Sequence, residues 1–148
     1  MASMENPTPL PLTDDALVLR TCFAKDEAWK AICDAIRKPV CVGADEFFAY
    51  VEFVEDQNFA DMDVPELLSR VPPNYPHTFL FVVDSVAIES PESPILVVDL
   101  YREPGRTFRT VPSQIQGIEN NLSIANMDFE SFAECVDDNG VFRDFPGD

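Results

Sequence analysis

Two runs in the chain, residues 78–84 and 95–101, are apolar on both faces of a strand. Continuous apolar strands of this length are typical of the middle of a sheet that is covered on both sides, as in α/β layer folds. Two further stretches predict strands: the short apolar run 16–21, and the run 47–54, which has one wholly apolar face and one mixed face. The pattern therefore predicts one sheet with 78–84 and 95–101 at its centre.

Helical spacing appears in the segments between these runs. One predicted helix follows Asp26, a candidate cap, and ends at Pro39. Its apolar residues share one face: Trp29, Ile32, Cys33 and Ile36. A second, shorter helix is predicted where Asp63, Pro65 and Glu66 form a capping-box pattern with proline in the first turn.

Two more helices are predicted in the last third of the chain. Ser113 and Gln116 form another capping-box pattern, and the apolar residues Ile115, Ile118 and Leu122 share one helical face. Asp128 has the character of an N-cap for a helix over 129–136. The buried stripe of that helix is expected to contain Phe129, Phe132, Ala133 and Val136.

These elements together predict an α/β (or α+β) fold. Residues 103–106, with proline second and glycine third, form a turn that joins 95–101 to the alternating run 107–111. We expect a mixed sheet of about four to six strands flanked by helices, with an antiparallel hairpin at one edge. The proline-rich residues 1–12 predict a flexible tail, and residues 13–148 a single globular domain.

The net charge of −17 narrows the choice of partners. Such a charge opposes binding to nucleic acid and to an anionic membrane surface, so a basic protein is the expected partner. It also favours a monomer. The acids form blocks: residues 44–66 contain eight acidic residues and no basic one. These blocks can equally be a solvated surface that keeps the protein soluble.

Cysteine and histidine usage points to no metal site and no cofactor. The four cysteines form no CxxC pair, and His77 is the only histidine. No signal peptide and no apolar run of membrane-spanning length is evident, so a reducing cytoplasm is the expected location. Glycine-rich phosphate loops and nucleophile elbows are absent from the sequence.

Polar residues within and after the second apolar run are the candidates for a ligand site. Asp99 is the polar residue for which burial is most expected, and it requires a hydrogen-bonding or cationic partner. The short basic island that follows is Arg102, Arg106 and Arg109, and the amide-rich segment contains Asn120, Asn121 and Asn126. The arginines can hold a carboxylate or phosphate, but they can also pair with the protein's own acids. The asparagines can orient a ligand, or serve only as caps and turns.

Three passages, 13–21, 100–109 and 120–132, resemble a family of small acidic proteins common in actinobacteria that is classed as a domain of unknown function. The similarity extends from Thr13 to Phe145. This resemblance implies a single domain and supplies no catalytic residue.

Two functional hypotheses follow from the sequence. The first is a non-enzymatic cytoplasmic interaction module whose acidic surface binds a basic protein. The second is a small enzyme or ligand-binding protein, with Asp99, the three arginines and the three asparagines around one polar pocket. The second hypothesis requires these side chains to converge on one concave site.

Overall fold

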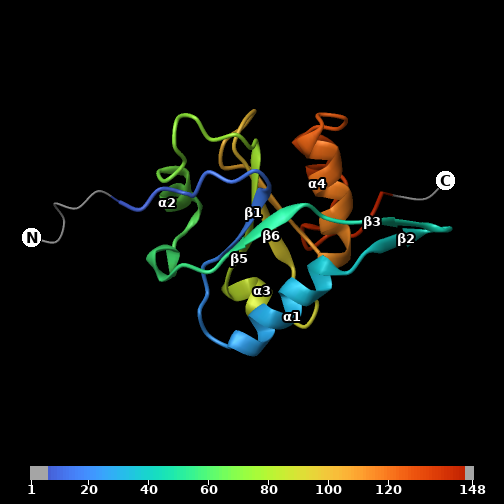
Figure 1. The fold of residues 1–148 in the computed structure, drawn as a ribbon, viewed down its shortest axis with the longest axis horizontal. Coiled ribbons are helices and arrows are strands. Elements are labelled where there is room, and N and C mark those ends of the chain that lie inside the picture. The colour runs from blue at the N-terminus through green and yellow to red at the C-terminus, as the bar shows by residue number, and fades with distance from the viewer. Residues whose placement is uncertain (1–6, 146–148) are drawn as a thin grey trace, which may run out of the picture.

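A six-stranded mixed sheet forms the centre of the molecule, and a separate two-stranded hairpin lies beside it (Figure 1). The structure is a computed structural model that describes residues 7–145. In spatial order the strands of the large sheet are β4 (Val51–Val54), β1 (Ala16–Arg20), β5 (Phe79–Val83), β6 (Ile95–Asp99), β7 (Thr107–Thr110) and β8 (Val141–Phe142). Only β6 runs against the other strands of this sheet. The predicted mixed α/β class is confirmed.

Helices cover both faces of the sheet. One face packs against α1 (Asp26–Arg37), α3 (Ser85–Glu89), α4 (Ile115–Ser123) and α5 (Phe129–Ala133). The other face is covered by α2 (Val64–Leu68), a 3-10 turn at Gln57–Phe59 and the N-terminal segment around Leu10. In Figure 1, α2 and α4 lie on opposite sides of the strands.

The central strand β5 is buried because both of its apolar faces are covered, as the sequence predicts. Phe79, Phe81 and Val83 of β5 enter the core under α1 and α4, whereas Leu80 and Val82 enter the core under α2. A strand with apolar side chains on both faces is stable only when both faces are covered. This arrangement confirms the predicted central position of 78–84.

The predicted antiparallel hairpin is formed by β6 and β7, and β8 adds two residues outside it in parallel orientation. Aromatic rings close this side of the sheet. The Phe108 ring lies 5.0 Å from that of Phe129 and 6.4 Å from that of Phe142, and Phe132 packs 5.2 Å from Phe142. This cluster joins α5 to the β8 side of the sheet.

The predicted continuous strand over 47–54 is wrong. The chain instead forms a hairpin of β2 (Val40–Val42) and β3 (Asp45–Phe47), leaves strand geometry at 48–50, and resumes as β4. The Tyr50 N–H donates to a side chain of α4, and the Phe48 carbonyl accepts from another. These bonds to α4 occupy backbone groups that a continuous strand would give to a neighbouring strand.

Two of the predicted helix starts also differ from the structure. Lys25, with φ +58°, takes the position before α1, and the Asp26 carboxylate binds Arg20 instead of capping. A 3-10 turn at Pro112–Gln114 precedes α4, so Ser113 forms no capping box. In contrast, the side chains of Asp63 and Asp128 cap α2 and α5 as expected, although α5 ends at Ala133.

The N-terminal segment packs against the α2 side of the sheet. Leu10 is buried, and its N–H donates to the Arg70 carbonyl at 2.9 Å. The Arg70 side chain donates in turn to the Thr8 carbonyl. The predicted domain boundary at Thr13 leaves out this buried leucine, and residues 1–6 and 146–148 lie outside the described residues. Within residues 7–145, no helix is long and apolar enough to cross a membrane.

Candidate functional site

A hollow of about 650 Å³ opens at the end of the sheet where β1 and β5 begin. We call it the first hollow. Its lining comes from the N-terminal segment, the connector before β5, residue 50 and the end of α4: Asp14, Asp15, Ala16, Tyr50, Pro76, His77, Thr78, Phe79, Glu119, Asn120, Leu122, Ser123, Ile124 and Ala125. This lining contains three carboxylates and no lysine or arginine. The first hollow is therefore suited to a positively charged group.

Glu119 is the buried carboxylate of the first hollow, with only 4% of its surface exposed. One carboxylate oxygen accepts from the Tyr50 N–H at 2.8 Å and from the Asn120 amide at 2.7 Å. The other accepts from the Ser123 hydroxyl at 2.7 Å. All three donors are neutral groups, so the carboxylate is hydrogen-bonded but forms no ion pair among the described residues.

The three asparagines form a network with their own helix and with segment 48–50. Asn120 donates to the Phe48 carbonyl and accepts from Gln116. Asn121 donates to the Gly117 carbonyl, and its side-chain oxygen accepts from the Asn126 amide. The amides thus bond chiefly to the protein's own groups, and only Asn120 lines the first hollow.

A second hollow of about 290 Å³ adjoins the first. The two hollows share lining from Thr78, Phe79, Leu122 and Ala125. The second hollow is also lined by Asp99, Arg102 and Asn126, three of the residues that the sequence suggested for a ligand site.

Asp99 is buried, as expected, but its carboxylate shapes a turn. One oxygen accepts from the Tyr101 N–H and the other from the Glu103 N–H, both at 2.9 Å. The buried charge is therefore stabilised by backbone donors of the β6–β7 turn, and within residues 7–145 no arginine forms an ion pair with it.

The arginine island is divided among three places. Arg102 lines the second hollow. Arg106 pairs with Glu103 at 2.8 Å and approaches Glu130 at 3.7 Å. Arg109 forms a forked pair with Asp84 at 2.7 and 3.0 Å and also donates to the Pro94 carbonyl.

The requirement that all seven candidate residues converge on one concave site is therefore not met. Asp99, Arg102 and Asn126 meet in the second hollow, and Asn120 lines the adjoining first hollow. The other three residues, Arg106, Arg109 and Asn121, line neither hollow.

Sequence reasoning missed the apolar residues around the first hollow. Ile124 is 74% exposed and Tyr50 is 61% exposed, and both line it. Phe48, two residues before Tyr50, is also exposed. The available signal was a large apolar residue, Ile124, between the polar positions Ser123 and Asn126 at the end of a helix.

The carboxyl end of β1 is occupied by a buried arginine of the protein itself. Ligands of open α/β sheets usually bind outside the carboxyl ends of the strands. Here Arg20, the last residue of β1, is completely buried and pairs with Asp26 at 2.8 Å and Glu55 at 2.7 Å. Its guanidinium also lies over the rings of Phe23 and Trp29.

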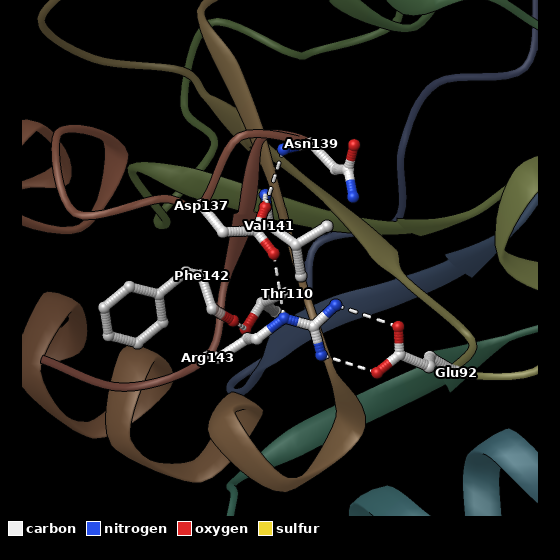
Figure 2. A network of polar contacts seen from close by, with 7 residues as sticks. All are labelled: Glu92, Thr110, Asp137, Asn139, Val141, Phe142 and Arg143. Carbon is white, nitrogen blue, oxygen red and sulfur yellow. Dashed lines mark hydrogen bonds and ion pairs between the residues drawn. The ribbon is translucent and has the colours of Figure 1, made fainter.

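Arg143 holds the C-terminal strand to the loop after α3, as Figure 2 shows. Its guanidinium forms a forked pair with Glu92 and donates to Asp137 at 2.9 Å. The Asp137 carboxylate also accepts from the Asn139 and Val141 N–H groups. The pKa of Glu92 and that of Asp137 are lowered mainly by the hydrogen bonds from Arg143. The same bonds raise the pKa of Arg143.

We expect acid to loosen β8. The folded state lowers the pKa of Glu92 and Asp137, so these carboxylates stabilise the fold fully above their unfolded pKa values, about 4. This stabilisation is lost as the pH falls through their folded pKa values. Hydrogen-exchange protection factors of Val141 and Phe142 should therefore drop in acid. Arg143→Gln should lower them already at pH 7. Equal protection in Arg143→Gln and wild type at pH 7 would disprove the role of Arg143.

Among the cysteines, Cys33 is not an activated nucleophile. All four are free, and burial raises the pKa of the Cys33 thiol to about 11. A thiol with that pKa stays protonated near neutral pH and is inert. Among residues 7–145, no three His, Cys, Asp or Glu side chains are grouped to hold a metal ion.

Comparison with known proteins identifies a family but no activity. No curated protein matches the sequence. A family model described as "Domain of unknown function (DUF6924)" matches residues 15–145, from the segment before β1 to the end of the described chain. Since this match covers nearly the whole fold, the chain belongs to the DUF6924 family.

Proposed function

We propose that this protein is a non-enzymatic interaction module that binds a basic segment of a partner protein at the first hollow. The observation that carries the proposal is the lining of that hollow: three carboxylates without a lysine or arginine, beside the exposed side chains of Tyr50 and Ile124. Interfaces combine such exposed aromatic and apolar anchors with a polar rim.

The charge of the whole chain supports the same proposal. A net charge of −17 attracts a basic partner over a long range and accelerates its association. It disfavours nucleic acid and anionic membranes as partners, and it favours a monomer in solution. Four free cysteines are typical of a protein that works in a reducing cytoplasm, where we place this interaction.

The alternative, a small enzyme or ligand-binding protein, has less support. Of the groups proposed for its pocket, Asp99 bonds backbone N–H groups with both oxygens, and Arg109 is engaged by Asp84. A catalytic carboxylate or a ligand-binding arginine must itself be left free to contact the substrate.

Selection from a phage-displayed library of random peptides tests the proposal. At low salt the protein should enrich peptides that contain lysine or arginine together with an apolar residue. Because exposed charges are screened within about 10 Å at 0.1 M salt, the binding of a selected and synthesised peptide should weaken as salt is added. The Ile124→Ser variant should bind about tenfold or more weakly, as expected when an apolar anchor is lost.

Val86→Ser is the matched control. Val86 is an exposed aliphatic residue on α3 that does not line the first hollow, so its loss should leave peptide affinity unchanged. The proposal fails if no basic peptide is enriched, or if Ile124→Ser and Val86→Ser bind the selected peptide with equal affinity.

A further inference from the structure

The outer edge of β4 is open. β4 pairs with β1 on one side, and among residues 7–145 no backbone group bonds to it on the other. In Figure 1, β4 is the teal strand that crosses in front of the other strands, and no helix lies over it. An uncovered edge presents N–H and C=O groups that can pair with another strand.

This edge is held in a fixed geometry by its own side chains. The Phe53 ring packs edge-on against Trp29 at 6.3 Å, and the Arg37 guanidinium lies 4.5 Å above it. Val54 packs into the core on the opposite face. Because both faces anchor the strand, a partner would find the edge already ordered and would not have to order it on binding.

Charge decides what kind of strand fits this edge. Proteins protect open edges with proline, lysine or other charges, and β4 contains only one such residue, the exposed Glu52. Glu55 and Asp56 follow it, and residues 44–66 contain no basic residue. Like charges directly opposite one another destabilise strand pairing, whereas opposite charges favour it. The edge therefore rejects a second copy of this chain and accepts a basic strand.

We infer that β4 binds an extended, basic segment of a partner protein as an added strand of the sheet. This inference rests on the proposed function, because Tyr50 of the first hollow directly precedes β4. One segment of the partner can thus contact the hollow and continue along the edge. Main-chain hydrogen bonds give affinity in this mode of recognition, and alternate side chains give specificity.

A synthetic octapeptide of alternating lysine and valine is the probe. Titrated into ¹⁵N-labelled protein at low salt, it should shift the amide resonances of residues 51–54 and slow their hydrogen exchange. The same peptide, N-methylated at one central lysine and one central valine, cannot pair through either edge and should bind at least about tenfold more weakly. An octapeptide of alternating glutamate and valine should not bind.

The Glu52→Lys variant tests the charge rule. The variant should bind the lysine–valine peptide about tenfold more weakly, because attraction is replaced by repulsion. It should also bind the glutamate–valine peptide, which the wild type should not bind. The matched control is Glu134→Lys, because that exposed acid follows α5 and belongs to neither β4 nor the first hollow.

The outcomes separate strand addition from the proposed function. If basic peptides bind, depend on Ile124, and are insensitive to N-methylation and to Glu52→Lys, strand addition is overturned and the interaction module stands. If neither the lysine–valine peptide nor any peptide from the library binds, both proposals fall.

Discussion

Replacing Asp26 by Asn and Glu55 by Gln together should lower the free energy of unfolding by about 3–5 kcal/mol. Both amides are close in shape to the acids and can still accept a hydrogen bond, so the change removes charge and little else. The Arg20 side chain has 0% exposure, whereas those of Asp26 and Glu55 are 74% and 53% exposed. The carboxylates can be solvated when unpaired, but the buried cation cannot.

Denaturant unfolding monitored by circular dichroism measures this loss. Adding Arg20→Met to the double variant should recover part of the lost stability, because methionine removes the unpaired charge while filling much of the volume. Asp34→Asn is the control, since its pair with Arg37 is exposed and 3.5 Å long, and its effect should stay below about 0.5 kcal/mol. A double variant within 1 kcal/mol (about the error of such measurements) of wild type would refute the argument.

Glu119→Ala is expected to have the second-largest effect, a loss of about 2–4 kcal/mol of stability. The change leaves the Tyr50 N–H, the Asn120 amide and the Ser123 hydroxyl without their acceptor. A fully buried donor left unsatisfied costs about 1–3 kcal/mol, but Tyr50 and Ser123 are exposed residues and Asn120 is half-buried, so water from the first hollow recovers part of that cost. Thermal and denaturant unfolding report the total.

A local measurement distinguishes this role from a general loss of packing. Amide exchange at Tyr50 should accelerate more than exchange in β5, because Glu119 ties segment 48–50 to α4. Glu130→Ala is the control on α5, where the carboxylate is exposed and lies 3.7 Å from Arg106. If Glu119→Ala and Glu130→Ala had the same stability and the same exchange at Tyr50, Glu119 would have no special role.

These contacts explain why the sequence predicted some elements better than others. The strands over 78–84 and 95–101 and the helix face of Trp29 and Ile36 follow from short-range periodicity, which appears directly in the sequence. The interruption at 48–50 depends on side chains of α4 roughly 70 positions later in the chain, as the separation of 69 between Tyr50 and Glu119 shows. No local pattern contains that information.

The sequence predicted only part of the candidate site, for a similar reason. The burial of Asp99 followed from its place in an apolar run, but its partners are backbone groups of the next turn. The pairing of the arginines with the protein's own acids was one of the two alternatives, and Arg106 and Arg109 follow it. The first hollow itself joins residues 14–16, 50, 76–79, 119–120 and 122–125, which only the folded chain brings together.

The sequence by itself determined the class of fold, the doubly buried central strands, the caps at Asp63 and Asp128, and the acidic character of the chain. Each of these depends on composition or on neighbours within one or two turns of the chain. Only the tertiary structure decided which strand is left open at the edge, which acids surround a hollow and which arginines are already paired. Those features depend on contacts between distant segments, whose geometry is fixed by packing rather than by local pattern.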